Sequence, residues 1–210
     1  KNVVNYFQNK FVQHNQNLKK IPQLINTGYL KLDHVIKKLG NLNSQKNQIL
    51  IAPTFSKQMT KYNMSNLIIE MIKTLLDKHE KVIFRPHPLD LTKKGNQNKI
   101  NKIIAIFKDH KNISIDMSVF YIKSYSKSKL LITDFSGTAY TYAYSTLRPV
   151  IFFSKNEDRL KKSSIHKLFY FKDRKKIGFI CKKISRLPDI INIIDINKKL
   201  FKQKIFKLRK

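Results

Sequence analysis

Three short turns along the chain carry residue types that bind phosphate or transfer protons. They are segments 52–54, 85–88 and 133–138, which read APT, RPHP and TDFSGT. Hydroxyl groups and a glycine at a helix start let a phosphate approach unpaired backbone N–H groups. An imidazole or a guanidinium can donate to the same phosphate. The candidate site residues are therefore Thr54, Arg85, His87, Asp134, Ser136, Gly137 and Thr138.

His87 is the candidate catalytic residue among the six histidines. Proline on both sides restricts its backbone and removes two N–H donors, so a rigid loop can fix the imidazole in position. A fixed imidazole can contact phosphate or take part in proton transfer near neutral pH. The alternative is a histidine that only caps the strand end. Arg85 is likewise either a bidentate phosphate donor or a surface cation.

The turn at 133–138 also allows two readings. Asp134 can accept hydrogen bonds from a ribose or a base. Helix capping alone is the alternative explanation for Asp134, Ser136 and Thr138, because short oxygen-bearing side chains commonly satisfy the first N–H groups of a helix.

The elements that must position these turns alternate from about residue 47 onward. Apolar strands are predicted at 48–52, 81–84, 112–115, 130–133 and 150–153, and helices at 64–79, 98–110, 119–126 and 138–146. This alternation predicts an α/β fold, a Rossmann-like parallel sheet with helices on both faces. The carboxyl ends of parallel strands open on one edge, so the three turns should meet in one cleft.

Three parts of the chain are expected. Residues 1–22 are polar and rich in Asn and Gln, typical of a tail or linker from an upstream lobe; residues 23–188 form the α/β domain; residues 189–210 form a basic amphipathic helix. Segment 25–33 is expected to be a first strand and loop, and segment 154–187 to be irregular. The final helix either lies on a membrane or packs back against a missing lobe, through Ile194, Leu200, Phe201, Ile205 and Phe206.

The composition is strongly basic, with 43 Lys and Arg against 13 Asp and Glu and a formal net charge of +30. Such a charge favours polyanionic partners, namely nucleic acid, an anionic membrane surface or phosphate-rich substrates, although a solvated basic surface explains it equally well. The single cysteine, Cys181, lies in an apolar run, excludes an internal disulfide and fits a reducing compartment. We expect a buried thiol there, and neither a signal peptide nor a bilayer-spanning run is visible.

The sequence lacks the motifs of several common enzyme chemistries. The chain contains no GxGxxG or GxxxxGK[ST] motif, which disfavours a dinucleotide fold and a P-loop enzyme. It contains no Cys/His cluster, no Asp-x-Asp pair and no GxSxG nucleophile elbow. We therefore expect no metal and no cofactor.

The polar turns resemble motifs of the CDP-glycerol glycerophosphotransferase family, which includes teichoic-acid polymerases and capsule-synthesis relatives. The matching segments occur in the family's order and cover about residues 25–155. They read GYLKLD, ILIAPTF, FRPHP and LLITDFSGTAYTYAYSTLRPVIFF. Leu30 and Lys31 stand where the family has Pro-Arg.

The resemblance implies the C-terminal, nucleotide-donor lobe of a two-lobed transferase of the GT-B type. Such an enzyme moves a polyol phosphate from a CDP-activated donor to an acceptor hydroxyl and releases CMP, with the general base supplied by the upstream lobe. His87 matches the family's essential histidine, and Ser136 matches the first serine of a pair whose second serine is replaced by Gly137. Thr54 and Asp134 match donor-site positions.

The implied partners are a CDP-linked donor, a polyol-phosphate or glycan acceptor, either free or lipid-linked, and an anionic membrane surface. The implied location is cytoplasmic, peripheral to the inner face of the bacterial cell membrane. One alternative is a glycosyltransferase of the same fold that uses a nucleotide sugar for capsule or lipopolysaccharide. The other is a basic nucleic-acid- or membrane-binding protein without catalysis, and the sequence shows no recognised nucleic-acid module.

Overall fold

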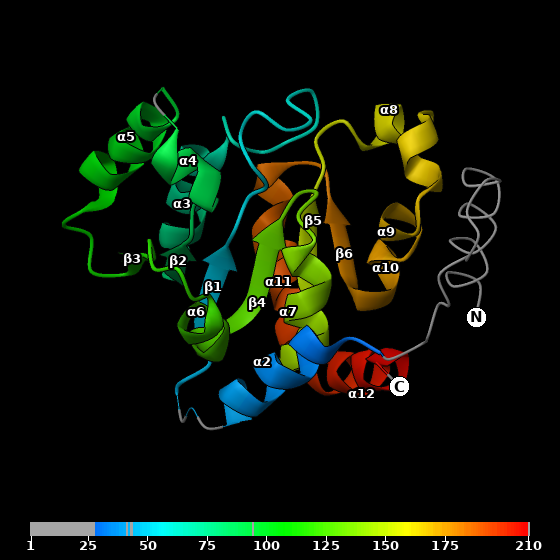
Figure 1. Cartoon of the computed structure of the whole chain (residues 1–210). Helices are drawn as coiled ribbons and strands as arrows, with labels where there is room; N and C mark the ends of the chain where they lie inside the picture. The colour runs from blue at the N-terminus through cyan, green and yellow to red at the C-terminus, as the bar shows by residue number, and fades with distance from the viewer. Residues whose placement is uncertain (1–27, 41, 43, 94, 210) are drawn as a thin grey trace, which may run out of the picture.

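The sheet of this protein has six parallel strands in the part that the computed structural model describes, residues 28–40, 42, 44–93 and 95–209. The strand order is β3-β2-β1-β4-β5-β6 (Figure 1). The chain therefore builds the sheet outward in one direction from β1 to β3 and in the other from β4 to β6. The strands are β1 Gln48–Ile51, β2 Lys81–Phe84, β3 Ile113–Ile115, β4 Ser128–Thr133, β5 Val150–Phe153 and β6 Gly178–Cys181.

Helices cover both faces of this sheet, as predicted for the fold class (Figure 1). One face packs against α3 Ile68–Leu76, α5 Gln97–Phe107 and α11 Leu187–Ile196. The other face packs against α2 Leu30–Gly40, α6 Ile122–Lys127, α7 Thr138–Thr146 and α12 Lys198–Arg209. Shorter helices complete the described chain: α4 Pro88–Thr92, α8 Glu157–Lys161, α9 Phe169–Lys172, α10 Arg174–Ile177, and the 3₁₀ turns Ser164–Lys167 and Ile184–Arg186.

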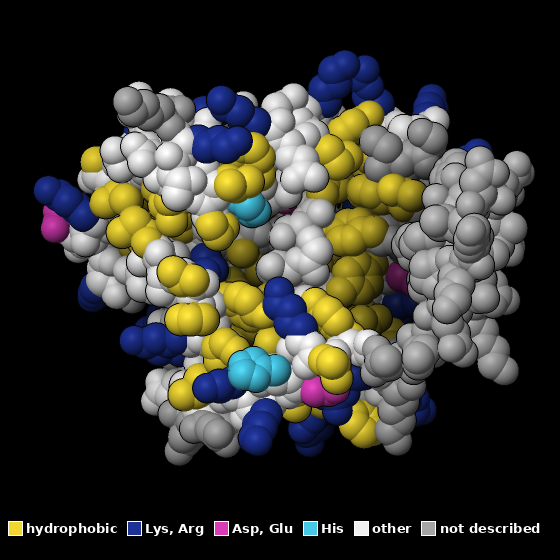
Figure 2. All heavy atoms as spheres, in the orientation of Figure 1, with side chains coloured by type: hydrophobic (Ala, Val, Ile, Leu, Met, Phe, Trp, Pro, Cys, Tyr) yellow, Lys and Arg dark blue, Asp and Glu magenta, His cyan; other side chains and the backbone are white. Residues whose placement is uncertain are grey.

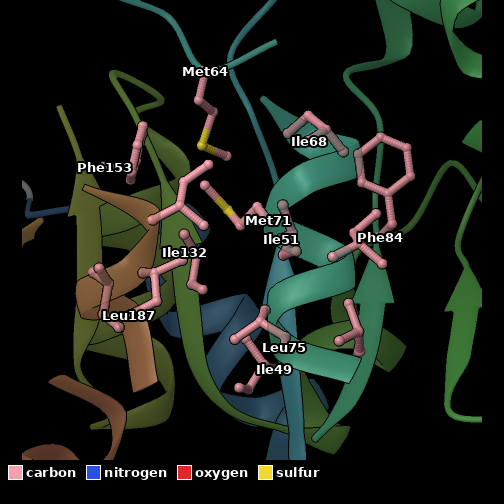
Figure 3. Close-up of a cluster of buried hydrophobic side chains, with 14 of the residues drawn as sticks. Ile49, Ile51, Met64, Ile68, Met71, Leu75, Phe84, Ile132, Phe153 and Leu187 are labelled. Atoms are coloured by element: carbon pink, nitrogen blue, oxygen red, sulfur yellow. The ribbon is translucent and has the colours of Figure 1, made fainter. Parts of the chain in front are cut away.

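The sheet has a hydrophobic core on each face because successive side chains of its central strands point to opposite faces. Ile49 and Ile51 belong to one hydrophobic cluster, whereas Leu50 between them belongs to the other. Leu131 in β4 lies in the same cluster as Leu50. Figure 3 shows the first cluster, where side chains of α3 and α11 meet those of β1, β2 and β4. Each such aliphatic side chain contributes about 1.5–3 kcal/mol by leaving water.

The N-terminal part of the described chain differs from the prediction. Residues 30–33 begin helix α2 instead of forming a strand and loop, and residues 25–27 lie outside the described residues. The apolar residues Leu32, Val35, Ile36 and Leu39 repeat at helical spacing. The helical repeat extends beyond residue 33, so segment 25–33 alone was too short to reveal it. Burial of Val35 against the sheet stabilises the helix.

Segment 154–187 is more regular than predicted, because it contains α8, α9, α10 and strand β6. Gly178 starts β6 opposite Val150, and its backbone approaches that residue too closely for any side chain. A strand that begins with glycine and follows a short basic helix carries no strong strand pattern. Cys181 ends β6 and is buried, as expected.

The C-terminal segment forms two helices, α11 and α12, where a single helix was predicted over 189–210. Ile194 packs into the cluster on one face of the sheet, and Ile205 packs into the cluster on the other. Leu200 and Phe206 remain 62% and 39% exposed. The segment thus packs on its own sheet through Ile194 and Ile205, and residues 1–22 lie outside the described part. Nowhere among the described residues is a helix long and apolar enough to cross a bilayer.

Candidate functional site

The three polar turns meet at the carboxyl edge of the sheet, around a hollow of about 290 Å³. The hollow lies beyond β2, β1 and β4, where the strand order reverses direction. Open α/β sheets bind ligands at such a switch point. The lining residues are Ala52, Pro53, Arg85, Pro86, His87, Pro88, Val119, Tyr121, Tyr125, Ser136 and Thr138.

His87 lies on the wall of this hollow, at the start of the short helix α4. Its Nδ1 atom accepts a hydrogen bond of 3.2 Å from the backbone N–H of Leu89. Since Nδ1 is an acceptor, the neutral ring carries its proton on Nε2. Burial lowers the pKa of His87, whereas the charges of Asp90 and Asp134 act in the opposite direction. The lowered pKa favours the neutral imidazole, which offers Nε2–H as a donor.

The turn before α7 presents Ser136 and Thr138 to the hollow. Ser136 Oγ accepts a hydrogen bond of 3.3 Å from the N–H of Thr138, the first residue of α7, although the N-cap position itself is held by Gly137. The hydroxyl hydrogen of Ser136 is left to donate to another group. Two tyrosines hold the turn from behind: Tyr170 donates to Ser136 O at 2.9 Å and Tyr125 to Thr138 O at 3.4 Å. The turn is thus held in place before any ligand binds.

Gly137 is exposed and does not line the hollow. Its φ of −57° suits any residue, and a Cβ added there meets no heavy atom within 4 Å. The backbone therefore does not require glycine at this position.

Asp134 does not line the hollow, in contrast to the role expected for it. Its side chain is fully buried and accepts three backbone hydrogen bonds, from Thr54 at 2.8 Å, Met64 at 2.9 Å and Phe135 at 2.7 Å. Burial raises the pKa of Asp134, and the three N–H groups oppose this rise. Asp134 joins the loop after β1 to the turn after β4, so it positions the site instead of contacting a ligand.

Thr54 is also buried and lies outside the hollow, although its neighbours Ala52 and Pro53 line it. Its N–H donates to Asp134, and its hydroxyl lies 3.5 Å from Gln58 Oε1. Thr54 therefore fixes the loop that follows β1.

Arg85 lines the hollow, but its guanidinium is held by the loop after β3. It forms an ion pair of 2.7 Å with Asp116 and donates to the carbonyls of Ser118 at 2.8 Å and Val119 at 3.2 Å. Burial alone would raise the pKa of Asp116, yet hydrogen bonds from Ser118 and Ser124 and the charge of Arg85 hold it below its usual value. Because these protein groups occupy its guanidinium, Arg85 supports the wall of the hollow.

Sequence reasoning missed the wall formed by Val119, Tyr121 and Tyr125. The rings of Tyr121 and Tyr125 lie 4.7 Å apart at an i, i+4 spacing, and that spacing was visible in the sequence. Val119 is 83% exposed at the rim and shows no distinguishing pattern. Among the described residues, no group of three or more His, Cys, Asp and Glu side chains is arranged to hold a metal ion.

Comparisons with known proteins agree with this architecture. A sequence model of the family described as CDP-Glycerol:Poly(glycerophosphate) glycerophosphotransferase matches residues 5–209. Minor teichoic acid biosynthesis protein GgaB of Bacillus subtilis (strain 168) is 27% identical over 192 residues, which are 80% of this chain and 19% of GgaB.

Two solved structures share the fold. The wall teichoic acid polymerase TagF has a TM-score of 0.52 at 23% identity, over 92% of this chain and 43% of the TagF chain. TarM has a TM-score of 0.52 at 18% identity, over 80% of this chain and 32% of the TarM chain. The chain therefore spans about a fifth of GgaB and about two fifths of TagF.

Proposed function

Because the chain belongs to the CDP-glycerol:poly(glycerophosphate) glycerophosphotransferase family, we propose that it forms the donor-binding part of a transferase that builds a cell-surface polymer. The transferred group is glycerol phosphate or a related polyol phosphate, and the donor is CDP-linked. GgaB is named for teichoic acid biosynthesis, and a variant of TagF has been soaked with CDPG. The observation that carries the proposal is the hollow at the switch point, with His87, Ser136 and Thr138 on its wall.

The donor diphosphate is proposed to lie against the turn that precedes α7. The N–H of Thr138 bonds to Ser136 Oγ and that of Ala139 to Ser136 O, which leaves the N–H of Ser136, a residue that lines the hollow, for a ligand. The start of α7 adds a partial positive charge. A volume of about 290 Å³ lies just below the usual range for a drug-sized ligand. The hollow therefore suits the diphosphate, with the cytidine extending beyond it.

His87 is proposed to stabilise the transferring phosphoryl group. The acceptor hydroxyl oxygen attacks the phosphorus that carries the polyol, and the bond from this phosphorus to the bridging oxygen breaks as CMP leaves. The neutral imidazole donates Nε2–H to an oxygen on which negative charge develops. A group outside the described site takes the proton of the acceptor, and we assign it to an upstream lobe.

The acceptor is proposed to be a polyol-phosphate or glycan chain held near the inner face of the bacterial membrane. The net charge of +30 supports attraction to anionic lipid. Figure 2 shows Lys and Arg side chains spread over the viewed face, around a centre rich in hydrophobic side chains. Sedimentation with anionic and with neutral vesicles tests this location, and equal recovery with both would contradict it.

Calorimetry with CDP-glycerol tests the site. The double variant His87→Ala/Ser136→Ala should bind at least about tenfold more weakly, because two hydrogen bonds to charged oxygens are lost. His34→Ala, an exposed histidine on α2, is the matched control and should bind like the wild type. Absence of CDP-glycerol binding by the wild type, or unchanged binding by the double variant, would overturn the assignment. Tighter binding of a nucleotide sugar would favour the glycosyltransferase instead.

A further inference from the structure

A second hollow lies at the amino edge of the sheet, opposite the candidate donor site, with a volume of about 590 Å³. It is formed by the segment before β1, the start of β4, the α7–β5 loop and the junction of α11 with α12, at the lower end of the sheet in Figure 1. Strand β4 has six residues and a strand rises about 3.3 Å per residue, so roughly 20 Å separate the two edges. The two hollows are therefore separate sites.

The lining of this second hollow is cationic. It contains six basic side chains and one carboxylate, namely Lys46, Lys129, Arg148, Lys198, Lys199, Lys202 and Asp195. Lys129 is neutralised by Glu80 at 2.9 Å and Asp195 at 2.8 Å. Arg148 donates to the carbonyl oxygens of Tyr125 and Ser128, which orients the guanidinium without neutralising it. The surplus positive charge therefore comes from Arg148 and from the remaining lysines.

These remaining lysines have no carboxylate within ion-pair distance in the part of the chain that the structure describes. They are Lys46, Lys198, Lys199 and Lys202. Lys198 and Lys202 are four residues apart on α12, a spacing at which like charges repel and destabilise a helix. The first turn of α12 holds no acidic residue that would offset this repulsion. A bound anion between the lysines would relieve it.

An apolar hollow of about 450 Å³ adjoins the cationic one. The two hollows share Leu147, Lys199 and Lys202, and the apolar one continues to Phe206. They form one groove, which we name the amino-edge groove, and its lining combines lysines with the apolar side chains of Leu147 and Phe206. A phosphodiester chain, in which phosphates alternate with short carbon spacers, offers both charge for the lysines and hydrocarbon for the apolar side chains.

We propose that the amino-edge groove binds a polyanionic phosphodiester chain, whose phosphates contact Lys46, Lys198, Lys199 and Lys202. The groove is an open hollow bordered by four chain segments, and a concave shape fits a polymer strand better than a flat bilayer. The proposal rests on the proposed function, because it assigns to the groove a part of the acceptor polymer distant from its reacting end. A polymer held there would stay attached between successive additions.

Binding of a short, fluorescently labelled glycerol phosphate oligomer to the full 210-residue chain tests the proposal. The wild type should bind the oligomer, and the fluorescence anisotropy should fall steeply as salt rises. The variant Lys198→Gln/Lys199→Gln/Lys202→Gln should bind at least about tenfold more weakly, since three exposed charge contacts are lost. Glutamine retains the helix propensity of lysine, so α12 should remain folded, as circular dichroism will verify.

The matched control removes three exposed lysines elsewhere, Lys73→Gln/Lys78→Gln/Lys102→Gln, and should bind the oligomer like the wild type. Equal weakening in both triple variants, or no binding by the wild type, would overturn the proposal. So would loss of anionic-vesicle binding with unchanged oligomer binding, which would identify the groove as a membrane contact. CDP-glycerol binding, measured on the same proteins, should be unaffected by either triple variant, so failure of the donor site is distinguished from failure of the groove.

Discussion

The substitution Asp134→Asn tests whether one buried carboxylate holds the candidate site together. Asp134 Oδ1 accepts the N–H groups of Thr54 and Phe135, and Oδ2 accepts that of Met64. In its best orientation the asparagine oxygen keeps the first two hydrogen bonds. Its NH2 group then faces the N–H of Met64, so two donors meet and neither has an acceptor.

The size of the effect follows from these contacts. Leaving a buried donor unsatisfied costs about 1–3 kcal/mol, and a hydrogen bond to a charged acceptor contributes about 1.5–3 kcal/mol. Part of this loss is offset, because burial of the carboxylate raises its pKa and so disfavours its charged form. We expect a net loss of about 2–3 kcal/mol. In a chain of 210 residues this lowers Tm by roughly 4–12 °C.

Urea unfolding followed by circular dichroism measures this loss directly. Asp109→Asn is the control, since that carboxylate is 89% exposed and should change stability by less than about 0.5 kcal/mol. Asp134→Asn should also weaken CDP-glycerol binding, because the loops after β1 and β4 are no longer joined. A loss of stability no larger than that of the control would refute the assignment of Asp134 as the joining residue.

Three further predictions concern single positions. Burial lowers the pKa of His87. The stabilising contribution of this histidine is therefore present above about pH 6.5 and is lost as pH falls through the lower, folded pKa. An NMR titration midpoint at or above the ordinary value would contradict this expectation. Gly137→Ser should leave stability within about 0.5 kcal/mol in urea unfolding and alter CDP-glycerol affinity in calorimetry, whereas a loss above about 1 kcal/mol would show that the turn needs glycine. Gly178→Ala should lose at least about 2 kcal/mol, because the new Cβ would lie 1.7 Å from Val150 O; unchanged urea unfolding would argue against the register of β6.

Sequence patterns predicted the central strands and helices because these elements bury nearly all side chains on one face or on both. The bounds of β2, α7 and β5 agree with the prediction, since short apolar runs and a helix between turn residues leave little choice. The convergence of the turns at 85–88 and 133–138 followed from the β/α alternation alone. Helix α2 and strand β6 were missed, because a partly exposed helix and an edge strand that begins with glycine carry weak patterns.

The sequence by itself determined the fold class, the family and the edge of the sheet where the site lies. These depend on local periodicity and on motifs that lie within a few residues of one another. The tertiary structure decided which polar residues face the hollow: His87, Ser136 and Thr138 do, whereas Asp134 is fully buried. The partners of Asp134 include Thr54, 80 residues away, and Arg85 bonds to Asp116, 31 residues away. A buried polar group must find a partner wherever the fold places one. Only the packed chain therefore distinguishes the motif residues that hold the site in place from those that face a ligand.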